Sequence, residues 1–260
     1  MSNNKYEKYT TFDSPIPYKS LLIYPATMRD YFEFMASSPV LLMDIYSVPD
    51  PKILSMKYLE YLFHIKEYDE ETKKDYYPYL NPLYFLLKLV LRIEDGDEDN
   101  KIEFFQPDGM PTIRIGKDVF DKNDFEVIRE IIIEQNLLNP PNHKIDKKLR
   151  DSMAEARTLK AKMGESKTCS IEDQMTALMT ETSLRMEDIY NMTIRRFSKA
   201  LERVDNTLHY KVYLSASMSG MVTFKDKSFI KHWLVDLQRD ELDELVAYNS
   251  IENTVTKGNL

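Results

Sequence analysis

The chain has 260 residues, of which 43% are hydrophobic and 30% charged, so it holds enough apolar material for a packed core and is not a disordered chain. Its 35 Lys and Arg against 43 Asp and Glu give a net charge of −8, which disfavours a nucleic-acid phosphate backbone as the main partner. It has only 6 glycines, where about 7% average usage would give roughly 18, and this argues against nucleotide-binding α/β enzymes and turn-rich β-sandwiches.

Short elements are predicted at the start of the chain. A flexible polar stretch covers 1–15, a strand runs over 18–24 to Pro25, and Thr27 begins a helix with Asp30 in a capping-box arrangement. The apolar side of this helix consists of Tyr31, Phe32, Phe34 and Met35.

The next predicted helices are longer. One helix with a wide apolar face covers 52–65, a charged solvated linker covers 67–75, and a central helix, apolar almost all round, covers 82–90. The pattern then changes to β type, with short strands at 89–93, 101–105 and 112–115 joined by turns at 95–100 and 107–109.

A further helix begins at Asp121 or Asn123 and ends at 139–142. Its shared apolar face holds Phe125, Ile128, Ile132 and Leu137. In the second half, Ser170 with Asp173 signals a helix start. Helices are predicted over 171–181, 186–191, 193–218 and 226–248, and the apolar residues of the third are Ile194, Phe197, Leu201, Val204, Leu208, Tyr210 or Val212, and Leu214.

The predicted fold class is mainly α (α+β). The predicted organisation is a flexible N-terminus (1–15), an α+β domain (16–142) with a small antiparallel sheet near 89–115, a polar helical linker (143–168), a C-terminal helical domain (169–249) and a flexible tail (250–260). The linker could be a solvent-bridging helix, a helix completed by a partner, or a tether, because its apolar residues are sparse among many charges.

No catalytic, cofactor or metal site is predicted, and the chain is not expected to be an enzyme. Asp95, Asp97 and Asp99 have the spacing of a calcium loop, but Asn100 and Gln106 stand where Gly and Glu are needed, so a solvated turn is expected. The histidines, His64, His143, His209 and His232, lack any metal-binding spacing.

The single cysteine, Cys169, excludes an intramolecular disulfide and indicates a reducing compartment. The N-terminus lacks the apolar core of a signal peptide, and the apolar stretch 80–91 is below the ~20 residues that span a bilayer, so no membrane association is expected.

Methionine and tyrosine are frequent, at 14 and 17 residues. They could fill a helical core, or they could form a surface for apolar protein partners, because both residue types suit adaptable interfaces. For Trp233 the same two interpretations stand, a structural anchor or a binding hot spot. The candidate interaction residues are Met186, Tyr190, Met192, Phe197, Tyr210, Tyr213, Phe229 and Trp233.

Three stretches resemble phage proteins. Residues 124–136, and 186–197 with 232–234, resemble tail-gene-region proteins of phages and prophages of Gram-positive bacteria. Residues 23–30 and 55–62 are similar in layout to baseplate-hub assembly proteins of contractile phage tails.

The resemblance implies a chaperone or hub-assembly factor that acts with the tape-measure protein in the host cytoplasm. The alternative is a structural part of the tail, baseplate or connector, retained in the virion. A third class, an unrecognised hydrolase, requires a pocket with convergent titratable groups. Protein partners and a homo-oligomer are expected, and nucleic acid is not.

Overall fold

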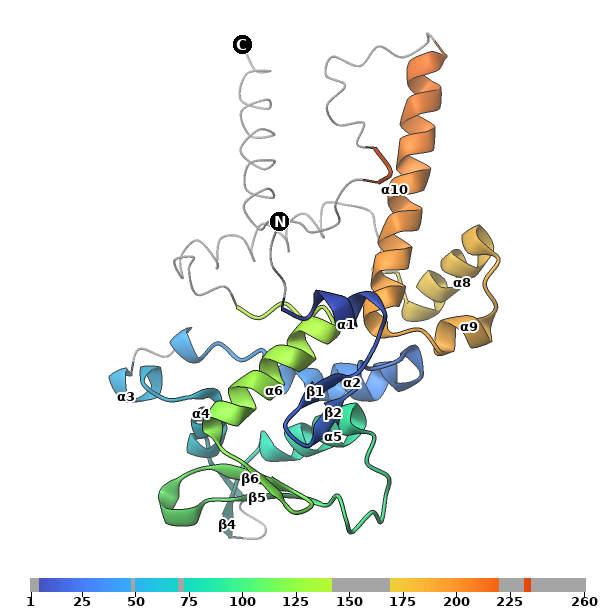
Figure 1. Ribbon diagram of the computed structural model, residues 1–260. Coiled ribbons are helices and arrows are strands. Elements are labelled where there is room, and N and C mark those ends of the chain that lie inside the picture. The colour runs from blue at the N-terminus through green and yellow to red at the C-terminus, as the bar shows by residue number, and fades with distance from the viewer. Residues whose placement is uncertain (1–4, 48–49, 70–72, 142–168, 220–231, 235–260) are drawn as a thin grey trace, which may run out of the picture. The chain divides into compact units, whose positions relative to one another are not determined.

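The computed structural model describes residues 5–47, 50–69, 73–141, 169–219 and 232–234 (Figure 1). They form two compact units. The first contains the described residues between 5 and 141 together with 187–197, and the second contains 169–186, 198–219 and 232–234. Helices dominate, and the sheets are small and antiparallel, which confirms the predicted mainly α, α+β class. The predicted polar helix over 143–168 lies outside the described residues, and the predicted domain limits stay predictions.

The first unit begins with α1 (Glu7–Thr11) and the hairpin of β1 (Ile16–Tyr18) and β2 (Leu21–Ile23). Within the stretch 1–15 that is expected to be flexible, Tyr6 is buried and α1 forms. The single strand expected over 18–24 is wrong. Lys19 adopts a left-handed φ of 52°, which turns the chain back on itself within two residues.

The 3₁₀ helix η1 (Met28–Asp30) leads into α2 (Tyr31–Ser37) and η2 (Ser38–Leu41). The Thr27 hydroxyl donates to the Asp30 carboxylate (2.7 Å) rather than capping a backbone N–H. The predicted apolar side of α2 is partly wrong, since Phe34 is fully buried whereas Phe32 is 69% exposed.

The helix predicted over 52–65 is two helices, α3 (Pro51–Leu54) and α4 (Tyr58–His64), preceded by η3 (Ile45–Ser47). Helix α4 begins directly after Lys57, whose backbone N–H donates to the Glu60 carboxylate (2.8 Å). The backbone N–H of Tyr58 donates to Glu126 of a distant helix (2.7 Å), so tertiary contacts fix the break.

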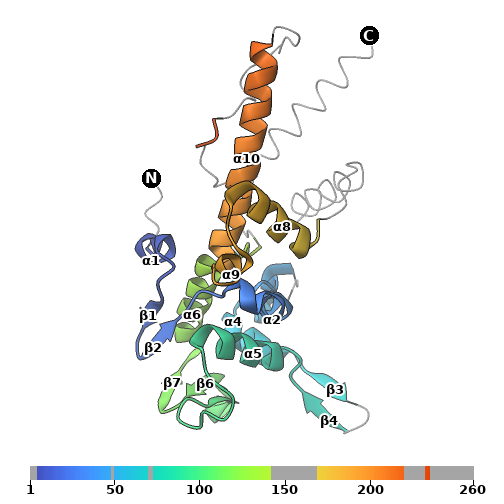
Figure 2. The ribbon, with the colours of Figure 1, turned by 90° about the vertical axis from the view of Figure 1, so that its right-hand side faces the viewer.

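A hairpin, β3 (Glu67–Asp69) and β4 (Lys74–Tyr76), replaces the predicted linker and precedes the N-terminal end of α5 (Leu80–Leu91) (Figure 2). The central helix is confirmed, with Leu83, Leu86, Leu87 and Val90 buried. The strand predicted over 89–93 is wrong. The helix continues to Leu91 and ends at Arg92, which has a left-handed φ of 55° and whose guanidinium lies 4.1 Å from the Tyr24 ring centroid.

The three-stranded sheet has the order β5 (Ile102–Phe105), β6 (Thr112–Ile115) and β7 (Asp118–Phe120), with the 3₁₀ turn η4 (Pro107–Gly109) between β5 and β6. Two of its strands agree with the prediction, and the third lies after them rather than before. The turn at 95–100 therefore joins a helix to a strand and is not a hairpin.

Gly116 makes the tight turn between β6 and β7 with a φ of 58°, and a Cβ there would lie 2.4 Å from the Asp99 carbonyl oxygen. We expect Gly116→Ala to lower the free energy of unfolding by about 2 kcal/mol, since strain and a backbone clash add. Gly96→Ala is the control, because Gly96 also has a positive φ but no atom within 4 Å of the added methyl. Equal losses in urea unfolding would contradict the clash.

Helix α6 (Lys122–Gln135) begins at the predicted Asp121, whose carboxylate accepts the Asn123 and Asp124 backbone N–H groups at 2.8 Å. Phe125, Ile128 and Ile132 are buried as predicted. Leu137 is the exception: it follows the helix end and is 38% exposed.

In the first unit α6 packs against α4, β2 and β7, while α5 packs against α2, η2, β2 and β5 (Figures 1 and 2). Two buried amides add polar links to the β1–β2 hairpin and to the segment that follows it. Gln135 Nε2 donates to the Ile23 carbonyl (3.0 Å), and Asn136 Oδ1 accepts the Ala26 N–H (2.9 Å). The largest fully buried side chains include Phe34, Leu41, Leu59, Leu62, Leu83, Leu86, Leu87, Ile113, Phe120, Phe125 and Ile128.

Asp124 links the start of α6 to the β1–β2 hairpin, accepting from Lys19 Nζ (2.6 Å) and the Tyr18 hydroxyl (2.8 Å). Burial alone would raise the pKa of Asp124, but these contacts and the Asp121 backbone N–H outweigh it and hold the pKa below its usual range. The stabilisation is therefore present above the unfolded value of about 4 and is lost as the pH falls through the lower folded value.

We expect Asp124→Asn to lower the free energy of unfolding by about 1 kcal/mol near neutral pH. The loss should be smaller in acid, because protonation of Asp124 there removes the same ion pair from the wild type. Urea unfolding at both pH values measures this. Asp118→Asn, at an exposed carboxylate, is the control. A cost that stays constant down to acid pH would contradict the ionic origin.

The second unit contains α8 (Ile171–Thr182), which begins at the predicted Ser170–Asp173 capping box. α9 (Met186–Tyr190), most of which belongs to the first unit, and α10 (Ile194–Met218), whose first turn belongs to it, also match their predictions. Of the helix predicted over 226–248 only 232–234 are described, and Trp233 and Leu234 lie in a turn. Among the described residues, no helix is both long and apolar enough to cross a membrane.

Candidate protein-binding surfaces

A segment from the second half of the chain is built into the first unit. This return segment, residues 187–197, joins the first unit through an antiparallel bridge between Thr27 and Thr193. The Met28 N–H donates to the Met192 carbonyl and the Ile194 N–H to the Ala26 carbonyl, both at 2.9 Å. The side chains of Ile189, Ile194 and Phe197 are buried.

Charged side chains hold the return segment at both ends. Arg29 pairs with Glu187 and donates to Asn191 Oδ1 (3.2 Å). At the other end, Arg195 Nη1 donates to the Glu134 carbonyl (2.6 Å). Arg196 Nε lies 2.7 Å from Asp13 Oδ2, and the Thr193 hydroxyl donates to Asp13 Oδ1 (3.1 Å).

Four candidate interaction residues lie in or next to the return segment. Phe197 is only 3% exposed, so its side chain packs inside the first unit. Tyr190 is 38% exposed, under the Arg29 guanidinium (5.8 Å to the ring centroid). Met186 and Met192 are half-buried. The sequence does not indicate that this segment belongs to the first unit, because its partners Asp13, Arg29 and Glu134 are more than fifty residues away.

The other candidates that the structure describes, Tyr210, Tyr213 and Trp233, lie in the second unit, on and beside α10. The Tyr210 ring lies 5.3 Å from the His232 ring, and Arg203 donates to the Trp233 carbonyl. His232 Nδ1 accepts the Leu234 N–H (3.1 Å), which fixes the turn. We call these five residues, Arg203, Tyr210, His232, Trp233 and Leu234, the aromatic corner.

The aromatic corner leaves apolar side chains open to solvent. Trp233 is 38% and Leu234 60% exposed. Tyr213 is half-buried and stacks on His209 (6.0 Å between ring centroids, 13° between planes). The remaining candidate, Phe229, lies outside the described residues.

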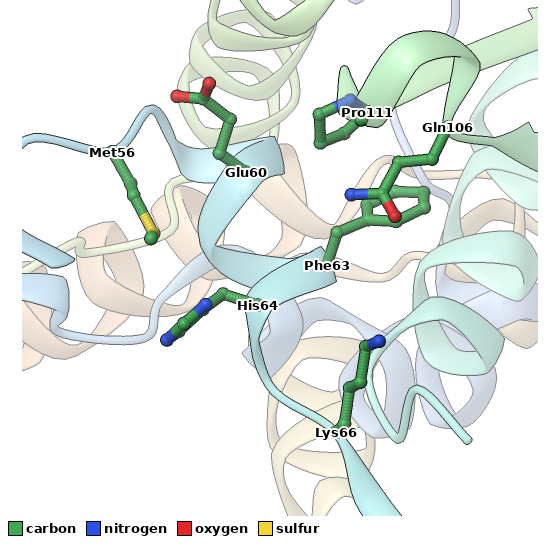
Figure 3. A pocket seen from close by; sticks show the side chains of 8 residues that line it. Met56, Glu60, Phe63, His64, Lys66, Gln106 and Pro111 are labelled. Atoms are coloured by element: carbon green, nitrogen blue, oxygen red, sulfur yellow. The ribbon is translucent and has the colours of Figure 1, made fainter. Parts of the chain in front are cut away.

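A shallow groove of about 330 Å³ lies in the first unit, between α4 and the β5–β6 turn (Figure 3). Glu60, His64 and Lys66 line it, but their side chains point in different directions. Burial alone would raise the pKa of Glu60. Hydrogen bonds from Lys122 Nζ (2.6 Å) and the Lys57 N–H outweigh this and lower it, so the group is an ion-paired carboxylate rather than an acid.

Among the residues that the structure describes, no three His, Cys, Asp or Glu side chains are grouped so that they could hold a metal ion. Cys169 is exposed. Asp97 accepts the N–H groups of Asp99 and Asn100 (3.1 and 3.2 Å), which makes the acidic stretch a locally hydrogen-bonded turn.

Residues 162–238 match the family model of the YomV second domain, which is associated with phages and prophages. The matched stretch contains the return segment, α10 and the aromatic corner. The match supports a phage protein, the broader part of the resemblance seen in the sequence. No curated protein and no solved structure matches the chain.

Proposed function

We propose that this protein is a non-enzymatic phage tail assembly protein, a chaperone or hub-assembly factor that binds the tape-measure protein of its phage. The observation that carries the proposal is the aromatic corner, which holds a partly exposed Trp233 and an exposed Leu234 within the stretch that matches a phage-associated family.

A tape-measure chain suits such a surface, because the resemblance implies a long helix with an apolar face that must stay covered until the tail tube closes around it. A helix of this kind presents anchors at i, i+3, i+4 and i+7. Tryptophan combines a large apolar area with a polar N–H, and it is enriched among the residues that dominate binding energy. Several copies bound along one tape-measure chain gain avidity while each copy stays displaceable.

In the groove of the first unit, two of the charged side chains are engaged with neighbours. Glu60 is committed to Lys122, and Lys66 Nζ lies 5.3 Å from the Tyr77 ring centroid. A hydrolase needs an acid, a base or a nucleophile aimed at one point, and the ionisable side chains that line this groove are not so arranged.

Co-expression with a tagged tape-measure fragment tests the proposal. We expect the wild-type chain to keep the fragment soluble and to co-purify with it, and Trp233→Ala to weaken binding at least tenfold. Phe12→Ala is the matched control, since Phe12 is an exposed aromatic residue (72%) outside the matched stretch. Failure of the wild type to bind or solubilise the fragment would overturn the proposal.

Mass spectrometry of purified virions distinguishes the alternative function. A chaperone is expected to be absent from the particle. A stoichiometric amount in the virion favours a structural component of the tail, baseplate or connector.

A further inference from the structure

The turn of the aromatic corner depends on an uncharged histidine ring. His232 Nδ1 accepts the Leu234 backbone N–H (3.1 Å), which requires that Nδ1 carries no proton, so the ring is neutral with its proton on Nε2. The centroid of the His232 ring lies 5.3 Å from that of Tyr210 and 5.7 Å from that of Trp233. His232 therefore connects the turn that carries Trp233 and Leu234 to the side of α10.

We propose that His232 is the positioning residue of the aromatic corner. Its neutral ring holds Trp233 and Leu234 in one turn as adjacent anchors for a partner, and protonation of the ring releases them. Trp233 is 38% and Leu234 60% exposed, and fixing such side chains before a partner arrives lowers the entropic cost of binding. The inference rests on the proposed function, because it assigns the residue that presents Trp233 to the partner.

Hydrogen-bond chemistry gives the direction of the pH dependence. His232 is exposed to solvent, and a protonated Nδ1 is a donor that cannot accept the Leu234 N–H. Arg203 donates to the Trp233 carbonyl and already brings a positive charge to the turn, so a charged ring adds repulsion. The corner is therefore formed at the higher pH and opens as the pH falls through about 8 to 5, the range in which histidine side chains change charge.

The other ionisable side chains at this part of α10 belong to types that do not change charge in that range. Arginine, tyrosine, lysine and glutamate side chains normally keep their charge state between about pH 5 and 8. These types include Arg203 and Tyr210, which contact the turn, and Glu202 and Lys211, which adjoin them in the sequence. A transition of the corner between these pH values therefore indicates a histidine.

Two substitutions of His232 separate the hydrogen bond from the ring. His232→Asn keeps an acceptor without a titration, because an Asn side-chain oxygen accepts the N–H two residues further on. His232→Phe keeps a ring beside Tyr210 but has no acceptor. We expect the first variant to form the turn at every pH between about 5 and 8 and the second to leave it open throughout.

Fluorescence anisotropy of the free full chain measures this. Trp233 is the only tryptophan, so the signal reports the mobility of this side chain alone. We expect the wild-type anisotropy to fall, between about pH 8 and 5, from the value that His232→Asn keeps to the value that His232→Phe has throughout.

His209→Asn is the matched control and should titrate like the wild type. His209 Nδ1 lies 3.3 Å from the Asp205 carboxylate, and its ring stacks on Tyr213, so protonation strengthens its ion pair and does not affect the turn. A wild-type anisotropy that does not change with pH would overturn the proposal. So would a titration that persists in His232→Asn, one that disappears in His209→Asn, or a His232→Phe chain that matches the wild type at the higher pH.

Binding of the tagged tape-measure fragment at about pH 8 and 6 connects the positioning with the function. We expect the wild type to bind roughly threefold more weakly at the lower pH, and His232→Asn to bind equally at both. If Trp233 titrates but the wild type does not bind the fragment at either pH, the proposed function fails and the positioning of Trp233 stands. If the wild type binds the fragment as His232→Asn does at both pH values, the positioning does not contribute to binding and this inference fails.

Discussion

Replacing Phe125 by alanine is expected to lower the free energy of unfolding of the first unit by about 4 kcal/mol. The Phe125 side chain is fully buried on α6, and its ring centroid lies 6.4 Å from that of Tyr58 on α4. Truncation removes the buried apolar area and leaves a cavity that α4 and α6 cannot close without moving. Because a domain of this size is stable by only about 5–15 kcal/mol, the loss is a large fraction of the total.

Urea unfolding followed by circular dichroism measures the effect of Phe125→Ala. The matched control is Phe32→Ala on α2, because Phe32 is 69% exposed and its truncation should change stability by less than about 0.5 kcal/mol. Similar losses for the two variants would contradict the placement of Phe125 in the core.

The second large effect is expected for Arg195→Ala, which should lower the free energy of unfolding by about 3 kcal/mol. Arg195 is 8% exposed, and its Nη1 donates to the backbone carbonyl of Glu134. The same nitrogen lies 3.5 Å from the Glu134 carboxylate. The variant loses a buried, charge-assisted hydrogen bond together with the packing of the aliphatic stem. Its neighbour Arg196, half exposed and paired with Asp13, is the control and should cost less than about 1 kcal/mol.

Hydrogen exchange gives a local measurement of the same change. In the wild type the Ile194 and Met28 amides donate to the Ala26 and Met192 carbonyls, so slow exchange is expected for both. We expect both to exchange faster in Arg195→Ala, because the return segment detaches more often, and to keep their protection in Arg196→Ala. Unchanged exchange in Arg195→Ala would show that the apolar contacts of Ile189 and Phe197 hold the segment without it.

Local chemistry was sufficient to predict several helix starts and apolar faces. The helix starts at Asp121 and Ser170 were predictable, because a capping box needs only residues three apart. The 3.6-residue apolar period was likewise sufficient for α5, α6 and α10. The break between α3 and α4 was not predictable, because Glu126 from a distant helix accepts the Tyr58 N–H.

The same limit applies to the candidate surfaces. Periodicity alone does not distinguish buried Phe197 from exposed Val212, although both belong to the apolar residues of α10. The aromatic corner depends on a contact between Tyr210 and His232, which are 22 positions apart. Residue type alone indicates the candidates, whereas burial divides those that the structure describes into packing and surface residues.

The sequence by itself determined the fold class, the caps and the apolar periods, because each depends on residues within one or two helical turns. Only the tertiary structure decided that 187–197 joins the first unit and which apolar residues remain exposed. Both depend on contacts between segments far apart in the chain. Bringing such segments together costs loop-closure entropy, which buried side chains and hydrogen bonds between them must offset, and a local sequence pattern does not indicate which segments meet.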